Sequence, residues 1–396
     1  MFVQDPRLNN DVANIINDLK EQLILNFRPK SIILIGSFGR GEATVIQSGC
    51  NLKFLSDCEV LIVPNNHLFD QMAIKKFCYD FFKKTGLEIT IGGVLISLYL
   101  SSSFFTKRLR PTIGNIDLKY GSKVIYGFNY LNQIPDIKPN DIPVWEGIRL
   151  ILNRMAEALD HFSIKSPSED MFFWTNKIVL ACQDTLLILA GLYTPSYRIR
   201  NDLFKKIYKN NFNCLYQKIP NFLDLSIKAT NYKLGKCNRY HDDIIEFWFE
   251  VRNIVDIIFK YIIDVEMGIR FNSYIRFQKY YLNNSLIQNS YFRGLTPNSL
   301  YQNITVLLKS YLLKNEGLPI KLMHRIKTPW IHIIYSSIPI LYFSLNKYGY
   351  IDEISLKHLN NVLSWFNCSF DFVIESLDLS ENIKKQVLHL WYSYCY

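Results

Sequence analysis

The stretch SIILIGSFGRGEA, from Ser31 to Ala43, decides how the first part of this chain is interpreted. A short run of mostly β-branched residues ends in Gly36-Ser37, and the glycine-flanked Arg40 follows. A short apolar run between turn signals is typical of a fully buried strand. The sequence therefore predicts a buried strand that ends in a tight turn. That turn is either an ordinary strand-to-helix connection or a binding place for a phosphate group.

The segment LSDCEVLIV, residues 55–63, gives the turn a chemical context. Asp57 and Glu59 are two residues apart at the start of a second predicted strand, so both carboxylates are expected on one face. Two neighbouring like charges are costly unless a cation or another partner offsets them. Mg²⁺ prefers oxygen ligands and is usually held by one or two carboxylates plus substrate phosphates. The alternative is a strand end with two solvent-exposed acids.

Helical spacing and turn signals complete the first part of the chain. Apolar residues recur with helical spacing in residues 11–27 and 67–86, and Asn66 is expected to cap the second of these helices. Residues 87–100 read as a third strand or strand pair. Residues 115–127 read as a hairpin with a two-residue Gly-Ser turn, which places Asp117 on a strand.

The texture of the sequence changes after a Pro- and Asp-rich stretch at about 132–143, which is interpreted as a linker. Long helical patterns follow. The predicted fold class is α/β plus all-α, with a small mixed-sheet domain at 1–135, a helical bundle at 143–280 and a C-terminal helical region at 281–396.

The order of these motifs resembles the DNA polymerase β-type nucleotidyltransferase superfamily. The resemblance rests on GSFGRGEA and LSDCEVLIV, with IDLKYGSKVIYG similar to the strand pair that carries the third carboxylate of the family. It covers roughly residues 10–130. Residues 176–200 are similar to the helical region that follows the catalytic domain in several bacterial and archaeal members. The chain departs from the family in a longer spacing between its two motifs, interpreted as a loop inserted at about 44–55, and in having Glu59 as the second acid.

The resemblance implies a catalytic domain that transfers a nucleoside monophosphate from a nucleoside triphosphate to a hydroxyl group and releases pyrophosphate. Two Mg²⁺ ions are implied, with Mn²⁺ as a substitute. Asp57 would bridge both ions, Glu59 would hold the one that carries the triphosphate, and Asp117 would hold the other and orient the acceptor. Glu88, at the start of the preceding strand, competes with Asp117 for the role of third acid.

The resemblance also implies a triphosphate-binding set. Gly36 would let the backbone approach the phosphates, and Ser37 would offer its hydroxyl and N–H groups. Arg40 reaches the triphosphate, forms a salt bridge with Glu42 or points outward. Lys177 is the first candidate for a further cation from the helical part, and it also fits a surface position.

Other cations in the helical part have competing interpretations. Arg198 and Arg200 follow Lys177 as candidates for the triphosphate, and each also fits a surface position. Arg154 and His161 are seven residues apart, a spacing found in helical ribonucleases that are often associated with nucleotidyltransferases. A structural helix face explains the same pair.

Composition limits the setting of the protein. The formal net charge of +10 favours anionic partners. The eight cysteines have neither zinc-site nor redox-motif spacing, so we expect reduced thiols and a cytoplasmic location. No signal peptide is expected. The apolar segment 330–345 is too short to span a bilayer, so no transmembrane span is expected there. A buried helix that is kinked or broken at Pro339 is the preferred interpretation.

The sequence thus predicts an enzyme, a nucleotidyltransferase that binds Mg²⁺ and a nucleoside triphosphate such as ATP. It does not identify the base. The acceptor stays open between a small molecule, an RNA 3′ end, a protein side chain and a second nucleotide. The oligomeric state also stays open. The alternative functions are a nucleotide- or RNA-binding module without activity, of the toxin–antitoxin type, and a helical-domain ribonuclease.

Overall fold

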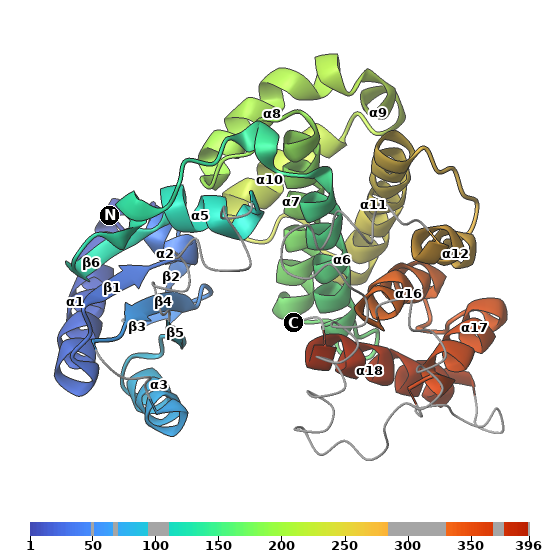
Figure 1. Cartoon of the computed structure of the whole chain (residues 1–396). Helices are drawn as coiled ribbons and strands as arrows, with labels where there is room; N and C mark the ends of the chain where they lie inside the picture. Colours follow the sequence, from blue (N-terminus) through green and yellow to red (C-terminus); the bar gives the residue numbers. More distant parts are fainter. Residues whose placement is uncertain (49–50, 66–69, 94–110, 284–329, 367–375, 395–396) are drawn as a thin grey trace. The chain divides into compact units, whose positions relative to one another are not determined.

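The computed structural model describes most of the chain (Figure 1). The described residues are 1–48, 51–65, 70–93, 111–283, 330–366 and 376–394. The chain divides into two compact units, each built from several segments of the sequence. The first unit comprises Met1–Pro143, Leu187–Asn213 and Leu223–Tyr240, and the second comprises Val144–Leu186, Cys214–Phe222 and His241–Tyr396.

A mixed four-stranded sheet forms the centre of the first unit. Its strands are β1 (Ser31–Leu34), β4 (Cys58–Val63), β5 (Ile89–Gly93) and β6 (Lys123–Gly127), in the order β5-β4-β1-β6. Strand β1 runs antiparallel to both β4 and β6, whereas β4 and β5 are parallel. The fold class predicted from the sequence is confirmed: a small mixed sheet with helices precedes a mostly helical region.

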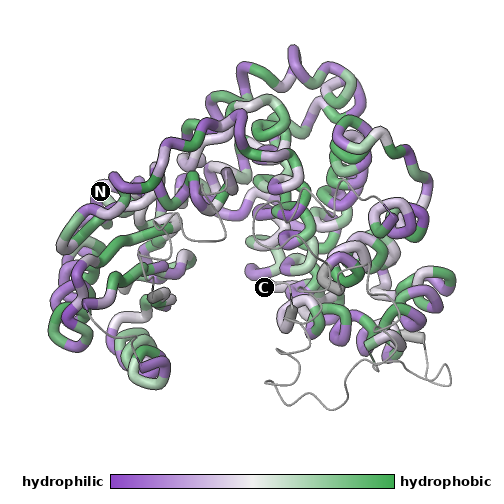
Figure 2. The backbone as a smooth tube through the Cα atoms, viewed as in Figure 1, coloured by the Kyte–Doolittle hydropathy of each residue, from purple (hydrophilic) through white to green (hydrophobic). Residues whose placement is uncertain are grey.

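The apolar runs of β1 and β4, drawn in green in Figure 2, explain why these strands are central. All four residues of β1 are buried, and the buried residues of β4 include Cys58, Val60 and Ile62. Both strands were predicted at these positions. The predicted third strand is confirmed over Ile89–Gly93, and the remainder of residues 87–100 after Gly93 lies outside the described residues.

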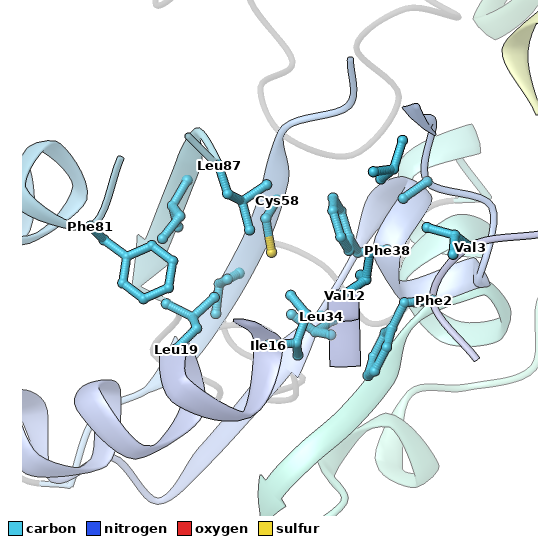
Figure 3. Close-up of a cluster of buried hydrophobic side chains, with 14 of the residues drawn as sticks. Phe2, Val3, Val12, Ile16, Leu19, Leu34, Phe38, Cys58, Phe81 and Leu87 are labelled. Carbon is cyan, nitrogen blue, oxygen red and sulfur yellow. The ribbon is translucent and has the colours of Figure 1, made fainter. Parts of the chain in front are cut away.

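Two helices, α1 (Pro6–Phe27) and α3 (Gln71–Thr85), contribute to a core with one face of this sheet. Figure 3 shows Leu19 of α1 and Phe81 of α3 with Cys58 in that core. The side chain of Asp70 accepts a hydrogen bond from the N–H of Met72 and caps α3. The N-cap predicted at Asn66 is therefore wrong, and Asn66 itself lies outside the described residues.

One short helix and two short strands separate β1 from β4. Helix α2 (Gly36–Arg40) follows β1, and strands β2 (Val45–Ser48) and β3 (Asn51–Phe54) pair as an antiparallel ribbon. The segment interpreted as an inserted loop at about 44–55 is thus a pair of strands.

The predicted hairpin at 115–127 is wrong in its first half. Residues Ile113–Gly121 form helix α5, and only β6 is a strand. The side chain of Thr112 accepts a hydrogen bond from the N–H of Asn115 and caps this helix. Gly121 lies tightly against Pro195, because a Cβ at Gly121 would be 2.9 Å from the Cβ of Pro195. A cap and distant packing therefore override the strand-like local pattern.

Two short 3₁₀ helices, η1 (Tyr130–Gln133) and η2 (Pro139–Asp141), follow β6 in the first unit. This unit also includes segments that the sequence assigned to the helical bundle at 143–280. They contain helix α8 (Tyr197–Asn211) and most of α10 (Phe222–Lys233).

The second unit is mainly helical in its described residues. Its helices are α6 (Val144–Asp160), most of α7 (Glu169–Leu189) and α9 (Asn213–Lys218), α11 (Ile244–Met267), α12 (Tyr274–Asn283), α16 (Trp330–Ser344), α17 (Glu353–Ser364) and α18 (Ser376–Tyr394). Helix α16 packs against α6, α12, α17 and α18. It is buried as predicted, and Pro339 lies within the helix.

One helix among the described residues is long and apolar enough to cross a membrane. It is α7, and 78% of its most apolar window is buried inside the protein. A mostly buried core helix of a soluble protein also meets these criteria of length and composition, so α7 is weak evidence for a membrane span.

Candidate functional site

The Gly-Ser turn and the acidic strand meet in the first unit. Leu34, at the end of β1, is paired with Val60 of β4, and the N–H of Ile35 donates to the carbonyl of Glu59 at 3.0 Å. Gly36 has φ +60°, and a Cβ at this position would lie 1.8 Å from Oε2 of Glu59. Only glycine fits this conformation beside the Glu59 carboxylate without strain. The two motifs singled out in the sequence are therefore neighbours in space.

The two acids of the second motif share one side of β4. Cys58 and Val60 are buried in the core on the other side, Glu59 is half-buried, and Asp57 is exposed immediately before the strand. Because successive side chains of a strand point to opposite faces, Asp57 and Glu59 lie on the face away from α1 and α3. The predicted placement on one face agrees with this burial pattern.

A third acid, Glu88, lies beside this pair at the sheet edge. The parallel register of β4 and β5 pairs Cys58 with Ile89, and the N–H of Cys58 donates to the carbonyl of Glu88 at 2.8 Å. Glu88 thus precedes β5 as Asp57 precedes β4, and both side chains are exposed.

Asp117 is placed differently from the sequence prediction. It lies on helix α5, where one carboxylate oxygen is 3.2 Å from Nη1 of Arg40 and the other accepts a hydrogen bond from the Tyr193 hydroxyl at 3.0 Å. Burial raises the pKa of Asp117, although Arg40, Arg200 and the Tyr193 hydroxyl act to lower it. Among the described residues, no group of three or more His, Cys, Asp or Glu side chains is placed to hold a metal ion. The predicted trio of Asp57, Glu59 and Asp117 is therefore not assembled.

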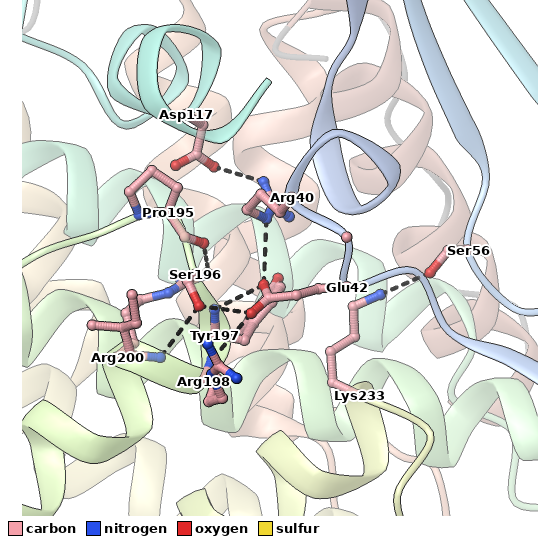
Figure 4. Close-up of polar contacts among 12 residues, drawn as sticks. Arg40, Glu42, Ser56, Asp117, Pro195, Ser196, Tyr197, Arg198, Arg200 and Lys233 are labelled. Carbon is pink, nitrogen blue, oxygen red and sulfur yellow. Dashed lines mark hydrogen bonds and ion pairs between the residues drawn. The ribbon is translucent and has the colours of Figure 1, made fainter. Parts of the chain in front are cut away.

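Arg40 belongs to a buried ion-pair network (Figure 4). Its side chain is only 9% exposed, and its Nε lies 3.7 Å from Oε2 of Glu42. Between the interpretations of Arg40 that the sequence left open, the structure shows the salt bridge with Glu42. Its guanidinium also faces Asp117, so the arginine of GRGEA holds α2 to α5.

Glu42 fixes the start of helix α8. Its carboxylate accepts hydrogen bonds from the Ser196 hydroxyl at 2.7 Å, the Tyr197 N–H at 2.9 Å and the Arg198 N–H at 3.3 Å. A carboxylate at a helix N-terminus satisfies N–H groups that have no partner within the helix, and it interacts favourably with the helix dipole. The side chain of Glu42 is 3% exposed, so these contacts are shielded from water.

The two arginines in the first turn of α8, Arg198 and Arg200, have different environments. Arg200 is buried, its guanidinium lies 4.0 Å from the ring centroid of Tyr197, and it donates to the carbonyl of Pro195 at 3.1 Å. The Arg198 side chain is exposed. Of these two, only Arg198 presents its side chain to solvent for an anion.

A buried lysine behind the acidic motif was missed by sequence reasoning. The Lys233 ammonium, at the end of α10, donates to Ser56 Oγ at 3.1 Å and Thr44 Oγ1 at 3.3 Å (Figure 4). Ser56 Oγ also accepts from the Thr44 N–H at 2.9 Å. These bonds hold the residue directly before Asp57. A lysine in the last turn of a helix is ordinary in a sequence, so no local signal marks this one.

The remaining predicted cations belong to the second unit and gather around Trp174. Lys177 Nζ lies 4.0 Å from the centroid of the Trp174 ring, Arg154 Cζ lies 5.8 Å from it, and the His161 ring stacks on it. Arg154 also pairs with the carboxylate of Glu157. The structure thus brings Arg154 and His161 to one aromatic ring, and it gives Lys177 a cation–π contact.

The residues at this edge of the sheet include the types that a metal-bound triphosphate would contact. Asp57 and Glu59 offer carboxylate oxygens, the ligand type that Mg²⁺ prefers, but with Glu88 they form no group of three that is placed to hold an ion among the described residues. Helix α2 begins at Gly36, and Ile35 before it has no side-chain group that could cap the first N–H groups. Backbone N–H groups of this kind suit contact with phosphate oxygens, while the Glu59 carboxylate fills the position that a side chain at Gly36 would occupy. No protein family, curated protein or solved structure matches the chain.

Proposed function

We propose that the protein is a metal-dependent nucleotidyltransferase, which transfers a nucleoside monophosphate from a triphosphate to an acceptor hydroxyl. The observation that carries the proposal is the contact between Gly36 and the Glu59 carboxylate. It supports the proposal because the Gly36 turn, which would bind phosphate, lies beside a carboxylate that would bind Mg²⁺. Both halves of the resemblance found in the sequence therefore meet at one edge of the sheet.

The roles of the residues follow from their positions. Asp57 and Glu59 would hold Mg²⁺ from one face of β4. When bound, the ion would neutralise phosphate charge and polarise the α-phosphate. The backbone of Gly36 and Ser37 would bind phosphate oxygens through N–H groups at the start of α2. The Ser37 side chain is largely buried, so its backbone N–H suits this role better than its hydroxyl.

The proposal assigns the third carboxylate to Glu88 instead of Asp117. Glu88 is exposed at the same sheet edge as Asp57, whereas Asp117 is bound by Arg40 and Tyr193. From its place beside Asp57, Glu88 would accept the proton of the acceptor hydroxyl. Arg40 is no longer proposed to bind the triphosphate, because it forms ion pairs with Glu42 and Asp117.

Transfer of a label from each of the four α-³²P nucleoside triphosphates tests the proposal. The protein is incubated with Mg²⁺ and size-fractionated cell extract, and labelled products are identified by mass spectrometry. Asp57→Asn removes one proposed ligand. We expect the loss of at least about 10²-fold in transfer rate, as is typical for a group that stabilises charge in a transition state. Asp11→Asn, at an exposed aspartate of α1, is the matched control and should retain transfer.

Two results would overturn the assignment. Transfer that persists in Asp57→Asn and Glu59→Gln would place the chemistry elsewhere. Absence of transfer with every nucleotide and every extract fraction, although the protein binds nucleotide or RNA, would favour the binding module. Both variants change exposed or half-buried side chains, so unchanged circular dichroism would show that the fold is retained.

A further inference from the structure

Helix α3 has an unusual outward face. Its exposed residues include Met72, Lys75, Lys76, Tyr79, Phe82 and Lys83, which we call the α3 face. Their spacings of three, four and seven residues place them on one side of the helix. Met72 is 79% exposed, Tyr79 58% and Phe82 48%. Three large apolar side chains therefore lie in solvent on the same surface as three lysines.

The outward position of these residues follows from how the helix is held. Ile74 and Phe81 are buried, and Phe77 and Cys78 pack against the core of the first unit. These four residues form the opposite side of α3. The apolar side chains of the α3 face are therefore additional to those that attach the helix to the sheet.

The charge of the helix is strongly positive. Asp80 is its one acidic residue, against four lysines. Lys84 is bound to Asp18 of α1 at 2.8 Å, which leaves Lys75, Lys76 and Lys83 as the cations of the α3 face. A cluster of like charges on one helix face attracts an anionic partner and raises its association rate.

We propose that the α3 face binds single-stranded nucleic acid. Lysine ammonium groups would pair with backbone phosphates, and the rings of Tyr79 and Phe82 would stack on bases. Lys83 Nζ already lies 5.0 Å from the centroid of the Tyr79 ring, so a cation and a stacking surface are presented together. The α3 face extends about 16 Å along the helix, enough for a few nucleotides.

An anionic membrane is a weaker match for this surface. Insertion of a helix into a membrane interface needs a continuous apolar face with lysines on the other side. In α3 the continuous apolar side is buried in the protein, and the exposed apolar residues alternate with lysines. That mixture of rings and cations suits a chain that carries both bases and phosphates.

The α3 face is separate from the candidate transfer site. Helix α3 packs on the sheet face that includes Cys58, whereas Asp57 and Glu59 lie on the other face. The inference does not depend on the proposed function, because binding by α3 is measured without nucleotide or transfer.

Fluorescence anisotropy with labelled U12 RNA and dT12 DNA tests the inference on the full chain. The triple variant Lys75→Gln, Lys76→Gln, Lys83→Gln is compared with the control triple Lys205→Gln, Lys206→Gln, Lys209→Gln, which removes the same charge from exposed positions of α8. The α3 triple should weaken binding at least about tenfold, because it removes three contacts to phosphate charge. It should also lower the slope of log K against log salt by about 2, since each phosphate contact on a single strand contributes about 0.7. The ratio of the affinities for U12 RNA and dT12 DNA shows which of the two nucleic acids the α3 face prefers.

A second variant separates stacking from charge. Tyr79→Ala should weaken binding about tenfold and leave the salt slope unchanged, because stacking on a base involves no counterion release. Vesicles with and without phosphatidylserine complete the test. Equal loss in both lysine triples, no binding of either oligonucleotide by the wild type, or binding to anionic vesicles without binding to oligonucleotides would each overturn the inference.

Discussion

The substitution Glu42→Ala tests whether the GRGEA segment is a structural connection. In the folded protein the Glu42 carboxylate is buried, receives three hydrogen bonds from the start of α8 and faces the Arg40 guanidinium. Alanine would remove all of these contacts at once. Arg40 would keep Asp117 as a partner, but the Ser196 hydroxyl and the first N–H groups of α8 would lose their acceptor.

The expected loss of folding stability is large for the replacement of one buried side chain. Removing one partner of a buried ion pair destabilises a protein by about 3–5 kcal/mol, because the remaining charge stays buried without full compensation. The Glu42 and Arg40 side chains are 3% and 9% exposed, which places this pair in that class. We therefore expect the free energy of unfolding of the first unit to fall by about 3–5 kcal/mol.

Urea unfolding and hydrogen exchange measure this loss. Amides of α8 (Tyr197–Asn211) should exchange faster in Glu42→Ala, and the unfolding transition of the first unit should shift to lower urea. Glu21→Ala, at a glutamate of α1 that is 69% exposed, is the control and should unfold at the wild-type concentration. A loss below about 1 kcal/mol in Glu42→Ala, with unchanged exchange in α8, would refute the structural interpretation.

Three further predictions test separate features. Gly36→Ala should destabilise the first unit by about 1–3 kcal/mol and reduce nucleotide binding, because its φ is +60° and its Cβ would meet Glu59; an unchanged urea midpoint would contradict this. Glu88→Gln should lower the transfer rate at least about 10²-fold while Asp117→Asn lowers mainly stability, and the reverse pattern in kcat and urea midpoints would restore Asp117 as the third acid. Burial lowers the pKa of His332 to about 3. The unfolded chain, with a histidine pKa of about 6.5, therefore binds one more proton than the folded chain between pH 6 and 4. The free energy of unfolding decreases as the pH is lowered through this range, by up to about 1.4 kcal/mol per pH unit. Urea titrations should show a shallower fall in His332→Gln, and an equal slope would exclude this cause.

The sequence was a good guide to the central strands. Ser31–Leu34 and Cys58–Val63 were predicted as strands because short runs rich in β-branched residues, bounded by turn signals, are typical of buried strands. The resemblance singled out Gly36 and Glu59 separately, and the structure brings these residues into contact.

The sequence was a poor guide where distant residues decide. Asp117 was expected on a strand, but Thr112 caps a helix there, and the Asp117 side chain meets Arg40 and Tyr193. The partners of Glu42 are more than 150 residues away in the sequence. Lys233 reaches Ser56 across a similar separation. Local patterns carry no information about such pairs, and tertiary contacts override local preference.

The most direct test of the central claim is a crystal structure of the protein with Mn²⁺ and a nucleoside triphosphate whose α–β bridge cannot be cleaved. Mn²⁺ gives an anomalous signal that locates it without assumption. The account predicts a peak within about 2.2 Å of carboxylate oxygens of Asp57 and Glu59, with the phosphates against the backbone of Gly36. An ion and nucleotide bound away from these carboxylates, or a peak at Asp117 instead, would contradict it.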